Sequence, residues 1–127
     1  MSKKEKDMQY YLDHYKSIKL ESKLLFSEDE ITQDEINFML ERAKNGFYRD
    51  CYQLGLYYHL RLKDKENAEK WWKKFISCSN GNILLRAFYQ LSNLCVYDWA
   101  YRCLNKAAKK GNKKAIKTIE TIKSEIN

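Results

Sequence analysis

Residues 43–75 read AKNGFYRDCYQLGLYYHLRLKDKENAEKWWKKF, and this stretch decides the fold. It predicts two helices, the second beginning after Asp64, whose carboxylate is suited to cap a helix start. Gly46 precedes the first helix, at a position where a left-handed turn can reverse the chain. Small residues at Gly55 and Ala68 allow the two helices to approach closely. The stretch therefore predicts a tightly packed helix pair.

Helical patterns continue over the rest of the chain. Thr32 and Glu35 have the spacing of a capping box, which marks the start of a helix. Gly46 would end this helix. The chain contains no proline and only four glycines, which favours long helices over multi-stranded sheets. Residues 3–25 predict an amphipathic helix whose apolar stripe consists of Met8, Tyr11, Leu12, Tyr15, Ile18 and Leu25. Further helices are predicted over about 48–62, 83–97, from Asp98 to Gly111, and 113–126.

The helix pair has a second, imperfect copy downstream. Leu54-Gly55 of the first copy corresponds to Leu91-Ser92, so the period is 91 − 54 = 37 residues. A period of about 20–50 residues is typical of stacked helical repeats. In both copies, a small residue faces the partner helix and large side chains fill the space beside that contact.

Two strings carry a resemblance to a known family. The string quoted above and YRCLNKAAKKGNKKAIKTI at 101–119 resemble Sel-one-like repeats, which are related to tetratricopeptide repeats. The resemblance covers about residues 40–120 and departs from the family at Ser92, where the repeat usually has glycine. It implies an all-α fold, a short right-handed solenoid of about three antiparallel helix pairs plus a terminal capping helix. We expect one domain over 1–127, with repeats over 40–127 and an N-terminal helix pair or cap over 1–39.

Charge is distributed unequally along the chain. Residues 1–50 carry 9 basic and 11 acidic side chains, a net charge of 9 − 11 = −2. Residues 51–127 carry 15 basic and 6 acidic side chains, a net charge of 15 − 6 = +9. Such polarity can steer an acidic protein or a nucleic acid, although a solvated lysine-rich helix face gives the same pattern.

No targeting or membrane-spanning segment is recognised in the sequence, so we expect a cytoplasmic protein that does not enter a membrane. Reduced thiols are the rule in that compartment. The four cysteines do not form a CxxC pair, and no zinc-ligand spacing is present, so neither a metal nor another cofactor is predicted. Pairing of Cys95 with Cys103 on air oxidation stays open.

Catalytic motifs are missing from the sequence, which has no glycine-rich phosphate loop, HExxH or nucleophile elbow. We therefore expect a protein that is not an enzyme. The family resemblance implies protein binding on the concave face of the repeats. The helix register nominates partner-binding residues on that face, which are Arg49, Tyr52, Leu56, His59, Arg86, Tyr89, Asn93, Tyr97, Lys114 and Lys117. The alternative is that Tyr52 and Tyr89 belong to the core.

Small size and an electrostatically biased surface favour a small cytoplasmic inhibitor or immunity-type protein that neutralises one partner protein, such as a toxin or an enzyme. An adaptor subunit of a larger assembly is an alternative in the same class. A second alternative is a nucleic-acid-binding protein that uses the basic C-terminal half, where exposed tyrosines could stack on bases. The acidic residues 28–35 are an alternative contact region for a basic partner.

Overall fold

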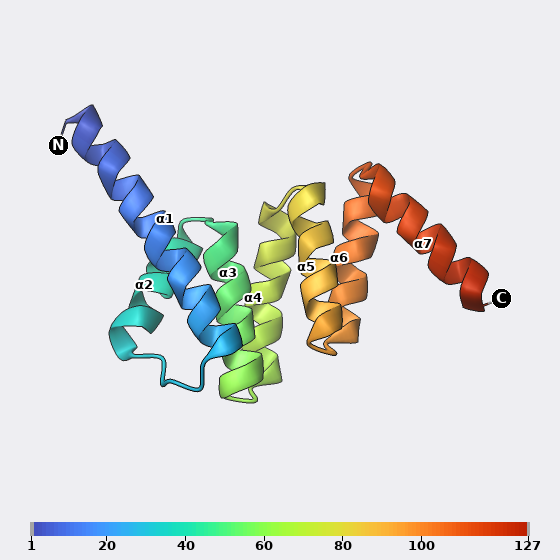
Figure 1. The fold of residues 1–127 in the computed structure, drawn as a ribbon, viewed down its shortest axis with the longest axis horizontal. Coiled ribbons are helices and arrows are strands. Elements are labelled where there is room, and N and C mark those ends of the chain that lie inside the picture. Colours follow the sequence, from blue (N-terminus) through green and yellow to red (C-terminus); the bar gives the residue numbers. More distant parts are fainter. Residues whose placement is uncertain (1, 127) are drawn as a thin grey trace. The chain divides into compact units, whose positions relative to one another are not determined.

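A computed structural model describes residues 2–126, and within this range every regular element is a helix, with no strand (Figure 1). The all-α prediction is therefore confirmed. The elements are α1 (Lys3–Phe26), α2 (Gln33–Lys44), α3 (Tyr48–Leu56), a π-helix η1 (Tyr57–Arg61), α4 (Lys65–Cys78), α5 (Gly81–Asn93), α6 (Tyr97–Lys109) and α7 (Lys113–Ile126).

The chain divides into two compact units, Met1–Phe75 and Ile76–Asn127. The first unit holds α1, α2, α3, η1 and most of α4, and the second holds the last residues of α4 with α5, α6 and α7. The expected stacking of antiparallel pairs into one right-handed solenoid stays a prediction.

The core of the first unit is built around α3, whose residues 50–56 are all buried. Helix α3 packs against α2 and α1, and Met39 of α2 and Leu54 of α3 have no exposed surface. Side chains as large as these contribute about 1.5–3 kcal/mol each when fully buried. Burial of this central helix therefore holds the unit together.

Gly55 permits the closest helix approach in this unit. A Cβ atom placed on Gly55 would lie 2.0 Å from Nε1 of Trp72 on α4, so only glycine leaves room for the indole. Trp72 is buried, and its Nε1 donates a hydrogen bond of 3.2 Å to the carbonyl oxygen of Tyr52. The close approach predicted at Gly55 is therefore present, and the atoms nearest to this residue belong to the Trp72 ring.

The end of α1 is fastened by one side chain from η1. The guanidinium of Arg61 donates hydrogen bonds to the carbonyl oxygens of Lys23 (2.9 Å), Ser27 (2.6 Å) and Asp29 (2.6 Å). The last carbonyls of a helix have no partner within the helix, so an arginine is well suited to satisfy them. Arg61 thus ties α1 and the segment after it to the turn before α4.

The second unit consists mainly of α5, α6 and α7. Helix α5 packs extensively against α6, and α6 packs against α7. The contact surfaces are apolar, and the fully or almost fully buried residues are Leu84, Leu91, Ala100, Cys103, Leu104, Ala107 and Ala115. Four of these seven are alanine or cysteine, so the helices can lie close together.

Turn geometry confirms some of the predicted helix boundaries and corrects others. Gly46 and Gly111 both have φ of +86°, as expected for glycines that end helices. Gly81, in contrast, begins α5, because the Asn80 side chain accepts a hydrogen bond from the backbone N–H of Ile83 and caps the helix there. Asp98 was expected to cap α6, but it lies inside the first turn and Val96 takes the cap position.

Candidate protein-binding surfaces

Two of the predicted partner-binding residues lie in the core of the first unit. Tyr52 is 5% exposed and its ring centroid lies 4.9 Å from that of Phe75, while Leu56 is 0% exposed. Their prediction as exposed positions is wrong, because α4 covers the side of α3 that carries Tyr52. The alternative weighed for Tyr52, a core residue, is the one that the structure supports.

The other two candidates in this unit are half-buried. Arg49 forms an ion pair with Glu21 of α1, with 3.0 Å between Nη1 and Oε2. The His59 ring lies 5.4 Å from the Trp72 ring. Burial lowers the pKa of His59, and the nearby charges of Lys65 and Lys63 lower this pKa further. Both residues therefore have structural contacts of their own and offer little free surface.

The candidates in the second unit are exposed. Arg86, Tyr89 and Asn93 occupy one side of α5 at helical spacing, and all three side chains are exposed. The Nζ of Lys114 on α7 lies 5.8 Å from the centroid of the Tyr89 ring, so α5 and α7 contribute to one surface. Tyr97 and Lys117 are exposed as well. The alternative that Tyr89 belongs to the core is wrong, because Tyr89 is 42% exposed.

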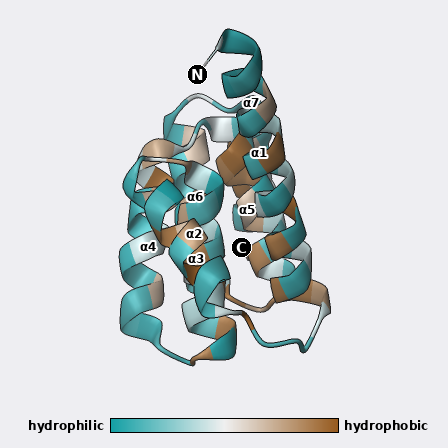
Figure 2. Ribbon diagram, turned by 90° about the vertical axis from the view of Figure 1, so that its left-hand side faces the viewer, coloured by the Kyte–Doolittle hydropathy of each residue, from teal (hydrophilic) through white to brown (hydrophobic). Residues whose placement is uncertain are grey.

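An exposed apolar surface lies on α1 and was not among the predicted sites. We name it the α1 outer face and define it by five side chains that are 40–66% exposed, namely Met8, Tyr11, Leu12, Tyr15 and Ile18. At about 100° per residue, the five side chains fall within a third of the helix circumference. Figure 2 shows hydrophobic segments in brown among hydrophilic ones along this helix.

Helix α1 packs against the rest of the unit through its opposite side. Its buried residues are Ser17, Leu20 and Leu24, which are centred roughly 170° from the outer face around the helix axis. The apolar stripe found in the sequence is therefore real, but it is not the packing face. The sequence pattern revealed the apolar stripe of α1. It did not reveal that three other residues form the side of α1 that is buried.

A buried polar group holds the packing side of α1. Asp50 of α3 is fully buried and accepts hydrogen bonds from Ser17 (3.4 Å) and from Nε of Arg42 (2.9 Å). Gln53 donates from Nε2 to the carbonyl oxygen of Ser17 (2.9 Å). Burial raises the pKa of Asp50, although the hydrogen bond and charge of Arg42 act in the opposite direction. These contacts fix the orientation of α1 and so determine which side faces outward.

The described residues contain no cluster of three or more His, Cys, Asp or Glu side chains that could bind a metal ion. Within the same part of the chain, no helix combines the length and the apolar character needed to cross a membrane. Within residues 2–126 no two cysteines form a disulfide; Cys51 and Cys103 are buried, whereas Cys78 and Cys95 are exposed.

Comparison with family models found no match, and neither the curated proteins nor the solved structures contained a chain similar to this one. The Sel-one-like resemblance therefore stays a prediction from the sequence.

Proposed function

We propose that this protein acts by binding another protein, without catalysing a reaction, and that the α1 outer face makes the central contact. The single observation behind this proposal is that five large apolar or aromatic side chains are exposed on one side of α1, opposite its packing side. Contiguous exposed apolar surface is unfavourable in water and commonly marks an interaction site.

The residue types on the outer face suit a protein interface. Tyr11 and Tyr15 are 66% and 61% exposed, and tyrosine is among the residues that contribute most to binding energy at interfaces. Lys4 and Lys19 lie on the same side of the helix and are exposed, and the Nζ of Lys19 lies 5.4 Å from the Tyr15 ring centroid. An apolar partner surface flanked by acidic side chains fits this arrangement.

We propose that the protein is a small inhibitor or immunity-type protein, which binds one partner protein and blocks its activity. A short stack of antiparallel helix pairs that presents α1 at one end is the accompanying fold proposal. The packing of α2 with α3 and of α5 with α6 supports it, as do the left-handed turns at Gly46 and Gly111.

The test begins with a tagged pull-down from the native host, with and without nuclease, to identify a stoichiometric protein partner. The purified partner is then titrated by calorimetry against Tyr11→Ala and against the matched control Tyr97→Ala, which removes a tyrosine that is 56% exposed from the second unit. We expect Tyr11→Ala to weaken binding at least about tenfold, because truncation of a hot-spot residue costs about 2 kcal/mol or more. Tyr97→Ala is expected to bind as the wild type does.

Three results would contradict the proposal. Unchanged affinity of Tyr11→Ala with weakened Tyr97→Ala moves the contact to the second unit. Capture that disappears with nuclease favours the nucleic-acid alternative. Sedimentation that shows a dimer which Tyr11→Ala dissociates means that a second copy covers the outer face. The partner's own activity, measured with and without this protein, distinguishes an inhibitor from an adaptor.

A further inference from the structure

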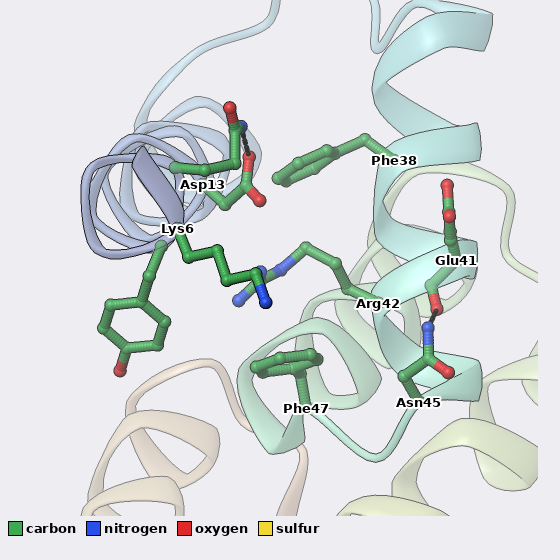
Figure 3. A pocket seen from close by; sticks show the side chains of 9 residues that line it. Lys6, Asp13, Phe38, Glu41, Arg42, Asn45 and Phe47 are labelled. Atoms are coloured by element: carbon green, nitrogen blue, oxygen red, sulfur yellow. Dashed lines mark hydrogen bonds between the residues drawn. The ribbon is translucent and has the colours of Figure 1, made fainter. Parts of the chain in front are cut away.

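A groove separates the first half of α1 from the corner where α2 leads into α3, on the side of α1 away from the outer face. It has a volume of about 490 Å³ and is lined from α1 by Lys6 and Asp13, among others. Phe38, Arg42 and Phe47 line it from α2 and the start of α3. Figure 3 shows Lys6 and Arg42 extending into the space between the rings of Phe38 and Phe47.

Arg42 is held in place as a rigid donor. Its Nε donates to the buried Asp50 at 2.9 Å, and its guanidinium carbon lies 4.0 Å from the Phe47 ring centroid and 5.5 Å from that of Phe38. The side chain is 12% exposed. Within residues 2–126, its two terminal nitrogens donate no hydrogen bond. They therefore present a fork of donors whose orientation is already fixed, which is the geometry that a carboxylate accepts.

Lys6 supplies a second cation from the opposite wall. Its ammonium group forms neither an ion pair nor a hydrogen bond with any other residue in the described part of the chain. Arg42 is already paired with Asp50 through Nε, so an anion placed between its terminal nitrogens and the Lys6 ammonium is attracted to both cations without displacing that ion pair. Phe38 and Phe47 exclude water from one side of the space, which strengthens such an interaction.

We propose that this groove binds an acidic peptide segment of a protein, with one aspartate or glutamate carboxylate held between Lys6 and Arg42. The proposal goes beyond the function assigned to the α1 outer face, because the groove lies on the other side of the helix and needs no contact with that face.

Two acidic side chains in the groove argue for a peptide and against a nucleic acid. Asp13 and Glu41 also line the groove, and Asp13 accepts a hydrogen bond of 2.9 Å from Gln9. A single carboxylate can sit between the two cations at a distance from these groups. The phosphates of a nucleic-acid strand lie in its backbone and would follow one another along the groove next to Asp13 and Glu41, whereas the side chains beside one bound carboxylate of an extended peptide point away from it and can turn to solvent.

The test is a nuclear magnetic resonance titration of the ¹⁵N-labelled full chain with an end-blocked hexaglutamate peptide. Controls are an end-blocked hexaglutamine peptide, inorganic phosphate and an oligothymidine strand. We expect hexaglutamate to shift the Nε–H signal of Arg42 and the backbone amides of Asn45 and Phe47, and hexaglutamine to leave them in place.

The matched variants are Lys6→Glu and Lys109→Glu, which make the same change of charge, the first in the groove and the second on α6 of the second unit. We expect Lys6→Glu to weaken hexaglutamate binding at least about tenfold and Lys109→Glu to change it less than twofold. Both lysines are exposed, so neither change disturbs the core.

The proposal is overturned if hexaglutamate shifts no groove signal, or if the two variants weaken binding equally, which would indicate nonspecific attraction. Equal shifts with hexaglutamine would show that the carboxylate is not recognised. Groove shifts that need less oligothymidine or phosphate than hexaglutamate would assign the groove to phosphate groups. None of these outcomes depends on the α1 outer face, so failure here is separable from failure of the proposed function.

Discussion

Replacement of Gly55 by alanine tests the helix contact on which the first unit depends. The new Cβ would lie 2.0 Å from Nε1 and 2.2 Å from Cδ1 of Trp72, whereas ordinary contacts begin at 3.4 Å. The indole must therefore retreat by about 1.4 Å, and that movement breaks its 3.2 Å hydrogen bond to the carbonyl oxygen of Tyr52.

Three contributions set the magnitude. Alanine gains about 1 kcal/mol over glycine in a helix interior. Overpacking of a filled core costs about 1–3 kcal/mol. Loss of the Trp72 hydrogen bond costs about 1 kcal/mol more. We therefore expect Gly55→Ala to lower the free energy of unfolding by about 1–3 kcal/mol.

The assay is urea unfolding followed by far-ultraviolet circular dichroism, with a double-mutant cycle that includes Trp72→Phe. The smaller phenyl ring relieves the clash, so alanine at 55 should cost less in the Trp72→Phe background than in the wild type. A Gly55→Ala protein that is about 1 kcal/mol more stable than the wild type would refute the close approach, since only helix propensity would then remain.

Three further predictions concern other parts of the molecule. Arg61→Ala should lower the free energy of unfolding by about 2–3 kcal/mol in urea titrations, because three carbonyl groups lose a charged donor, and a loss below about 0.5 kcal/mol would contradict the contact. Burial alone would raise the pKa of Glu35, but hydrogen bonds from Lys23 and Thr32 lower this pKa below 4.5. The ionised Glu35 therefore stabilises the fold above pH 4.5, and this contribution is lost as the pH falls through the lowered pKa. Glu35→Gln should therefore flatten the decline of the unfolding midpoint with acid, and an unchanged slope would count against it. Burial raises the pKa of Cys103 to about 12, so thiol titration of the native protein at pH 8 should label the two exposed cysteines and leave Cys103 unreacted until urea is added.

Local signals in the sequence predicted local structure well. The capping box at Thr32 and Glu35 is present, with both hydrogen bonds formed. Asp64 accepts from the backbone N–H of Asn67 at 3.1 Å, so the start of α4 was also predicted correctly. Both features depend on contacts within four residues, which the order of residues alone determines.

Contacts between distant residues account for what the sequence did not reveal. Cys95 adopts a φ of +62°, a conformation that glycine usually takes, and this turn ends α5 earlier than the helical pattern predicted. Tyr52 fits either an exposed or a buried position by periodicity, and only the arrival of Phe75 from α4 decides between them. The same ambiguity concealed the α1 outer face, because a helical stripe indicates an apolar side without saying what covers it.

The first buried residue of α1 is Ser17, so more than half of this helix contributes no buried side chain to the unit. Backbone hydrogen bonds in that part depend on the helix alone, and isolated helices of about this length are marginal in water. Amide hydrogens should therefore exchange with solvent progressively faster from Leu20 back toward Lys6. A ligand that binds this half of the helix would slow amide exchange there first. The exchange rate of the α1 amides therefore reports whether a ligand is bound, whatever its chemistry.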